Sequence, residues 1–69
     1  MEKGWKQVLL TSSVITAELA KSILENEGIR AVVLNRKDSS FHLSNDEIAV
    51  YVEEHSEGKA IELLKELEN

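Results

Sequence analysis

Glu47-Ile48-Ala49-Val50-Tyr51-Val52 is the stretch that decides the fold of this 69-residue chain. Its β-branched residues stand at every second position, so in an extended strand they point to one side, while Ala49 and Tyr51 point to the other. Alternation of this kind is typical of a strand with two different faces. We expect it to form the central strand of a sheet, with a neighbouring strand on each side.

The first neighbouring strand is expected at Trp5–Thr11, where apolar and polar residues also alternate. The second is expected at Arg30–Leu34, which is apolar on both faces after its first residue. A continuous apolar run favours burial on both sides, or burial on one side and association through the other. Regular alternation divides the first strand into one face with Val8 and Leu10 and another with Trp5, Gln7 and Leu9.

A helix is expected between these two strands, over Val14–Glu27, because apolar residues recur there at helical spacing. Ser13 is positioned to cap its first turn by accepting a hydrogen bond from a free backbone N–H. Many helices are followed by a residue in the left-handed backbone conformation, and Gly28 can adopt that conformation without strain. With the glycine in that place, Leu24 and Ile29 become the apolar pair that meets in a Schellman motif.

A second helix is expected after the central strand, running to about Leu67. Acidic residues at its start suit the helix dipole, and Ser56 or a neighbour is expected to cap it. Gly58 lies early in this helix and weakens it relative to alanine.

The element order β-α-β-β-α predicts an α+β fold made of a single domain over residues 1–69. The crossover between the first two strands leaves a gap that the third strand fills, which gives an antiparallel sheet in the order 1-3-2. Both helices are then expected on one face, as a two-layer sandwich. This is a ferredoxin-like unit that lacks its last strand, and the first strand is left as an open edge.

Composition narrows the classes of function. Thirteen acidic and eight basic side chains give a net charge of −5, which disfavours nucleic acid and anionic membrane as partners. The chain has no cysteine, no stretch of about 20 apolar residues and no signal-like start. We therefore expect a cytoplasmic protein without disulfides or thiolate metal sites.

The sheet face without helices is the first candidate for function. It is expected to be apolar, and such a face more often marks association than bare solvent. Cover by the chain's own first residues, or by Phe41, is the alternative. A homodimer or a protein partner is expected to contact an interface made of Trp5, Gln7, Leu9 and Tyr51.

The loop that follows the second strand is the other candidate. It runs from Asn35 to Asp46, longer than most hairpin loops, and long loops tend to carry binding. A small anionic metabolite would bind to a set of residues made of Arg36, Lys37, Asp38, Ser39, Ser40 and Phe41. A solvated turn, with the aromatic packed on the core, accounts for the same residues.

Catalytic and metal sites find little support. Asp38, Ser39, Ser40 and His42 crowd one loop, whereas a catalytic triad needs a rigid scaffold and an oxyanion hole. The two histidines lack helical metal-ligand spacing, and no glycine-rich phosphate loop is present. We expect a protein that is not an enzyme, with no metal and no cofactor.

The chain resembles a bacterial family of short proteins described as putative signal-transducing proteins, in particular Bacteroidetes-type members. The resemblance covers nearly the whole chain and rests on stretches in a fixed order: Trp5 onward, Ala17-Glu18-Leu19, Leu24-Glu25, Gly28-Ile29, Ala31 to Asn35, Lys37 to Phe41, Ile48 to Val52 and Lys59-Ala60. It implies a fold similar to PII regulators. Relatives often carry proline where Glu53 stands and a helix former where Gly58 stands. The nucleotide-binding loop of PII proteins has no counterpart here, so nucleotide binding is not implied.

We expect, from these observations together, a small regulatory binding module that acts through protein contact or self-association. The alternative is a sensor of a small anionic metabolite that uses the loop from Asn35 to Phe41.

Overall fold

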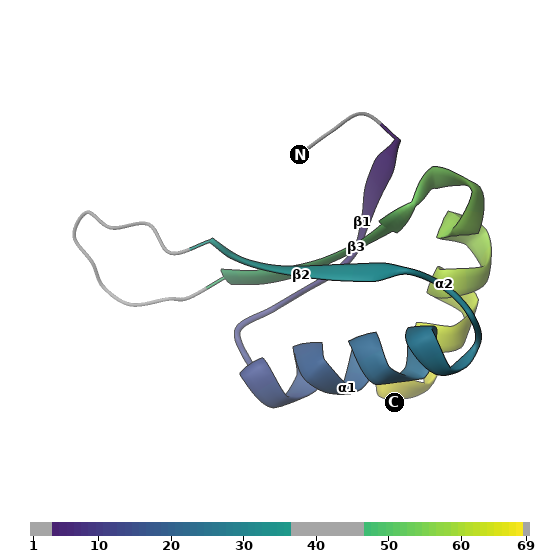
Figure 1. Cartoon of the computed structure of the whole chain (residues 1–69). Helices are drawn as coiled ribbons and strands as arrows, with labels where there is room; N and C mark the ends of the chain where they lie inside the picture. The colour runs from purple at the N-terminus through teal and green to yellow at the C-terminus, as the bar shows by residue number, and fades with distance from the viewer. Residues whose placement is uncertain (1–3, 37–46, 69) are drawn as a thin grey trace.

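A computed structural model describes residues 4–36 and 47–68 of the chain. The described part contains three strands, two α-helices and two short 3-10 helices (Figure 1). In chain order they are β1 (Trp5–Thr11), α1 (Val14–Asn26), β2 (Ala31–Arg36), β3 (Glu47–Glu53), η1 (Glu54–Ser56), α2 (Glu57–Leu64) and η2 (Lys65–Glu68).

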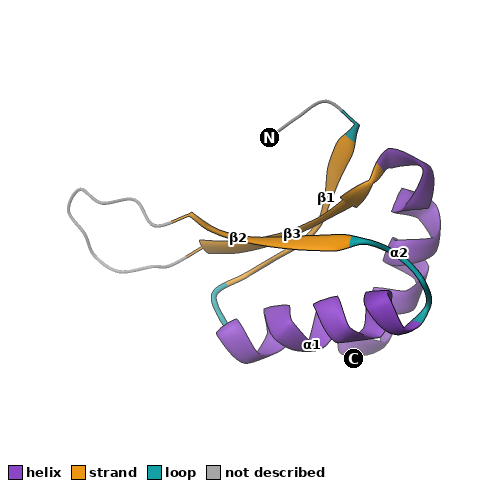
Figure 2. Ribbon diagram, in the orientation of Figure 1, coloured by secondary structure: helices purple, strands orange, loops and turns teal. Residues whose placement is uncertain are grey.

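The three strands form an antiparallel sheet in the order β1-β3-β2, with β3 in the middle. Both α-helices pack on one face of this sheet, as the arrangement in Figure 2 shows. The α+β class, the element order and the strand order predicted from the sequence are confirmed. β2 lies slightly further along the chain than expected, because its pairing with β3 continues to Arg36, opposite Glu47.

α1 has the two end structures that its sequence predicts. The Thr16 N–H donates to the Ser13 hydroxyl oxygen at 3.1 Å, which satisfies one free amide of the first turn. At the other end Gly28 takes a φ of +82°. The N–H of Ile29 then donates to the Leu24 carbonyl at 2.9 Å, and that of Gly28 donates to the Glu25 carbonyl at 3.0 Å. These two bonds are those of a Schellman motif.

The hydrophobic core lies between the sheet and the two helices. β3 supplies the three β-branched residues that point to the helices, and α1 and α2 supply small and branched residues against them. Loss of this apolar surface from water is the main stabilising contribution to such a domain. The buried cluster consists of Ala17, Ala20, Leu24, Ile29, Ile48, Val50, Val52, Ala60 and Leu64.

β1 does not alternate regularly, which corrects one prediction. Gln7 pairs with Tyr51 and Leu9 pairs with Val50, so Val8 is an extra residue, a β-bulge. Because one inserted residue exchanges the two faces of a strand, Leu9 lies on the helix side, where it packs against the core cluster. The expected place of Leu9 on the face without helices was wrong, and Leu10 lies there instead, opposite Ala49.

The C-terminal helix differs in its start. η1 leads directly into α2, and the Ser56 side chain makes no capping hydrogen bond. Glu53, which precedes η1, makes no such bond either, so the prediction that Ser56 or a neighbour caps this helix was wrong. η1 and α2 follow one another without a break, so a helical turn already precedes the first residue of α2. A 3-10 turn is a common way to begin an α-helix, and it takes the place in which a capping side chain would otherwise lie.

Candidate functional site

The face of the sheet opposite the helices is the first candidate surface of the described residues. Strand register assigns its side chains, because residues that pair across strands point to the same side. We call this surface the open face. It consists of Trp5, Gln7 and Leu10 from β1, Ala49 and Tyr51 from β3, and Val32 and Leu34 from β2.

One apolar row crosses the open face from edge to edge. Leu10 pairs with Ala49, and Ala49 pairs with Leu34 on the other side. The two leucines are 49% and 37% exposed, while Ala49 between them is fully buried. Ala49 nevertheless does not belong to the core cluster that packs against the helices. The row is therefore a second apolar contact, on the side of the sheet away from the core.

The next row combines polar and aromatic groups. Gln7, Tyr51 and Val32 pair across the three strands, and Tyr51 and Val32 are half-buried while Gln7 is exposed. Tyrosine in such a place offers a rigid apolar ring with a hydroxyl group, a combination enriched in protein interfaces.

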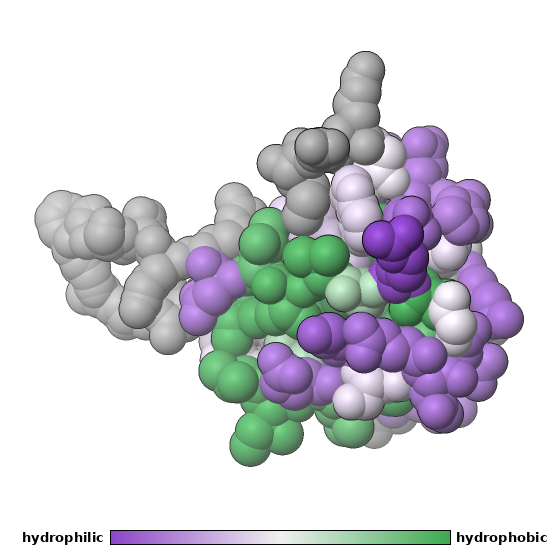
Figure 3. Space-filling model, in the orientation of Figure 1, coloured by the Kyte–Doolittle hydropathy of each residue, from purple (hydrophilic) through white to green (hydrophobic). Residues whose placement is uncertain are grey.

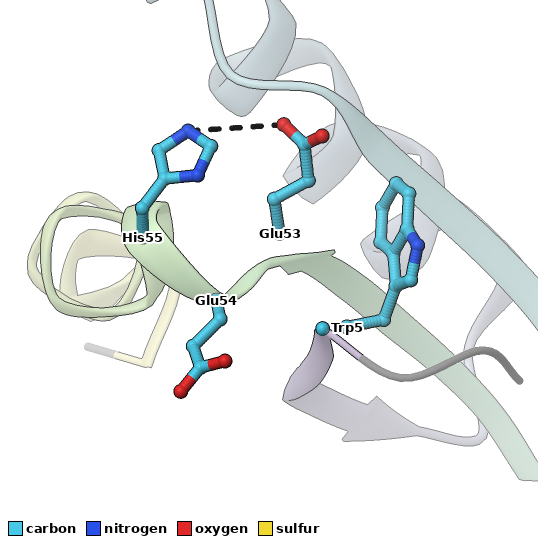
Figure 4. Close-up of a pocket in the computed structure, with 5 residues that line it drawn as sticks. Trp5, Glu53, Glu54 and His55 are labelled. Carbon is cyan, nitrogen blue, oxygen red and sulfur yellow. Dashed lines mark ion pairs between the residues drawn. The ribbon is translucent and has the colours of Figure 1, made fainter.

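A third row, in which Trp5 pairs with Glu53, ends the open face at a shallow depression of about 570 Å³. Its lining residues are Gly4, Trp5, Glu53, Glu54 and His55, drawn in Figure 4. Trp5, Glu53 and His55 project to the same side, whereas Glu54 points away from them. The backbone N–H of Glu54 donates to the Gly4 carbonyl at 2.6 Å and holds the start of β1 against the end of β3.

Glu53 is the charged centre of this end of the sheet. One carboxylate oxygen lies 3.8 Å from the Arg30 guanidinium, and the other lies 3.8 Å from Nε2 of His55. Arg30 and His55 are 76% and 77% exposed, so solvent screens both pairs. Exposed pairs of this kind stabilise a fold by about 1 kcal/mol at most. The cluster therefore forms a polar rim to the open face.

Comparison with known proteins gives a family. A family model described as "Putative prokaryotic signal transducing protein" matches residues 5–68, which includes every strand and helix of the fold. The chain belongs to this family. The resemblance inferred from its short sequence stretches is thereby confirmed, while the Bacteroidetes origin stays a prediction. No curated protein and no solved structure matches the chain.

The structure places three of the four residues predicted for a partner interface on one face of the sheet. Trp5, Gln7 and Tyr51 lie on the open face, and Leu9 does not. Leu10 and Leu34 were missed, because the apolar runs around them fit either face of a strand. Only the pairing register with β3 separates the two possibilities.

The predicted loop site is placed differently. Arg36 is the last residue of β2, where its backbone pairs with Glu47. The other members of that set, Lys37, Asp38, Ser39, Ser40 and Phe41, lie outside the described residues. The metabolite hypothesis therefore stays a prediction.

Two further observations concern the chemistry of the described residues. Within 4–36 and 47–68, no three histidine, aspartate or glutamate side chains gather closely enough to hold a metal ion, and no polar or charged side chain is buried. Across the same segments, no helix has both the length and the apolar character needed to cross a membrane.

Proposed function

We propose that this signal-transducing family member is a non-enzymatic binding module that contacts a protein partner through its open face. The row from Leu10 through Ala49 to Leu34 carries this proposal. It places two exposed leucines on either side of a buried alanine, on a face where neither helix packs. Apolar patches of this kind, rimmed by polar residues, are typical of protein interaction sites.

The composition of the open face supports a protein partner. Trp5 and Tyr51 are half-buried aromatic residues, a type that carries much of the energy of protein interfaces. Gln7 and the cluster around Glu53 supply a polar rim. Interfaces commonly have an apolar centre inside such a rim.

Charge favours some partners over others. The net charge of −5 opposes contact with phosphate backbones and with anionic lipid. A neutral or basic protein surface meets no such repulsion. We therefore propose a protein partner that presents apolar side chains with basic groups around them.

The test uses one variant on each face of the molecule. Leu10→Lys places a charge in the apolar row, and Ile15→Lys places the same charge on α1, where Ile15 is 79% exposed. A partner is first captured from the native cytoplasm with the unmodified chain and purified, and its affinity for each variant is then measured by titration calorimetry. Circular dichroism establishes that both variants are folded.

The proposal predicts that Leu10→Lys weakens binding at least about tenfold and that Ile15→Lys leaves it within about twofold, because only the first change lies in the contact. Equal affinity of Leu10→Lys and the unmodified chain would overturn it. So would cross-links from the partner that map to α1 and α2.

A further inference from the structure

The two edges of the sheet differ in how they are protected. β1 carries the bulge at Val8 and an exposed lysine at Lys6. Bulges and lysines are the devices by which natural sheets prevent a further strand from pairing with an edge. The edge on the β1 side is therefore a poor template for another strand.

β2 has neither device over most of its length. It pairs with β3 residue for residue from Ala31 to Arg36, and its first four residues are apolar. Figure 3 shows hydrophobic surface where β2 runs, continuing to the start of α1. A regular apolar edge strand presents backbone N–H and C=O groups to a further strand. These backbone groups can pair only with another extended strand, so the expected partner of this edge is a strand.

A second copy of β2 fits this edge. Two identical strands can pair antiparallel about a twofold axis perpendicular to the sheet. Such an axis keeps each side chain on its own face of the sheet, so one residue of the strand must pair with its own copy across the axis. An axis at Val33 places Val32 of one copy opposite Leu34 of the other, twice over, on the open face. Apolar residues then meet apolar residues across the new contact.

The charges at the two ends are compatible with this register. In this register Arg30 of one copy pairs with Arg36 of the other, and β3 has an acidic residue at the neighbouring position in each case. The Arg30 guanidinium lies 3.8 Å from Glu53, and Arg36 pairs with Glu47 in the strand register. Each copy nevertheless carries a net charge of −5, so the two copies repel at long range. Added salt screens that repulsion and strengthens the contact.

The small core of the domain gives a second reason for pairing. Its largest fully buried side chains, among the residues described, are Leu24, Val50 and Val52, and three of its other members are alanines. Domains of this size often gain stability by association, because one small core contributes little.

We propose that two copies of the chain pair antiparallel along β2, which joins their two three-stranded sheets into one of six strands. The apolar rows of both copies then form one continuous surface, and the helices of both copies cover the other side. The pairing goes beyond the proposed function and does not depend on it, since the open face remains free for a protein partner.

Charge exchange at Leu34 tests this pairing in the full chain. Leu34 is 37% exposed, so Leu34→Lys and Leu34→Glu change the contact at little cost to the fold. Leu10→Lys is the matched control, because Leu10 flanks the same Ala49 on the opposite edge. Sedimentation equilibrium of each protein, over a range of concentrations and at low and high salt, gives the dimer dissociation constant.

The unmodified chain is expected to sediment as a species of twice 7.8 kDa, more tightly associated at high salt. Each Leu34 variant alone raises the dissociation constant at least about tenfold, because a charge then lies opposite the apolar Val32 of the other copy and diagonally across from the same charge. An equimolar mixture of the two variants lowers the dissociation constant again, because opposite charges then lie diagonally across the contact. Leu10→Lys leaves the dissociation constant of the unmodified chain unchanged.

Three results would overturn the pairing. One is an unmodified chain that stays monomeric at every protein and salt concentration. This includes a monomer whose β2 amides become protected from hydrogen exchange only when a peptide is added, because β2 would then pair with a peptide and not with a second copy. Another is a dimer that tolerates both Leu34 variants. The third is a dimer that Leu10→Lys dissociates. A monomer that still loses its partner through Leu10→Lys would end this inference and leave the proposed function standing.

Discussion

Leu24 and Ile29 meet across the end of α1, where the Ile29 N–H donates to the Leu24 carbonyl at 2.9 Å and both side chains are buried in the core. The bond closes a turn that needs Gly28 at a φ of +82°. This contact joins the helix to β2 and sets the place at which the second strand enters the sheet.

Gly28→Ala is expected to destabilise the protein by about 1 kcal/mol, because a Cβ disfavours the left-handed backbone. No atom beyond the two neighbouring residues lies within 4 Å of the added Cβ, so the cost is that of the backbone conformation alone. Urea unfolding followed by circular dichroism measures the difference. A variant as stable as the unmodified chain would show that the turn does not need a left-handed residue.

Gly58→Ala is the matched change with the opposite sign. Gly58 lies in α2 and has no positive φ, and a Cβ added there meets no atom within 4 Å apart from its chain neighbours and the backbone of its own helix. Alanine loses less backbone entropy than glycine on entering a helix, so the free energy of unfolding is expected to rise by about 0.5–1 kcal/mol. The same urea titration tests it. A decrease in stability would show that the backbone of Gly58 is not helical.

Ser13→Ala is expected to lower the free energy of unfolding by about 1 kcal/mol, because the Thr16 N–H then loses its acceptor. Ser13→Asp is expected to retain most of the stability, since aspartate also caps helices and suits the helix dipole. Ser12→Ala, at the exposed neighbouring position, is the control and should change stability by less than about 0.5 kcal/mol. Thermal unfolding of the three variants separates loss of the cap from general loss of serine.

The confirmed predictions concern short-range structure. Ser13, Gly28 and the pair Leu24 and Ile29 are close in sequence, so their roles follow from the chemistry of one helix and its ends. The central strand was equally clear, because β-branched residues at alternate positions leave little choice of face. Strand order then followed from general rules on crossovers and from the gap that the first two strands leave.

The errors concern structure that depends on distant partners. Val8, Leu9 and Leu10 are all apolar, so the sequence fits either phase of a strand, and only pairing with β3 shows that Val8 is the extra residue. Ser56 is a good capping residue, yet η1 precedes α2, and the cap is not formed. A local pattern cannot report a bulge that two strands create together.

The bulge at Val8 leads to the last prediction, which compares two neighbouring leucines. Leu9 is half-buried and packs against the core cluster, whereas Leu10 is 49% exposed on the open face. Leu9→Lys is expected to lower the free energy of unfolding by about 2 kcal/mol or more, since it brings a charge to the core. Leu10→Lys should change it by no more than about 0.5 kcal/mol. Urea titrations of the two variants give the comparison, and the reverse order would mean that β1 alternates regularly and that Leu9 faces away from the helices.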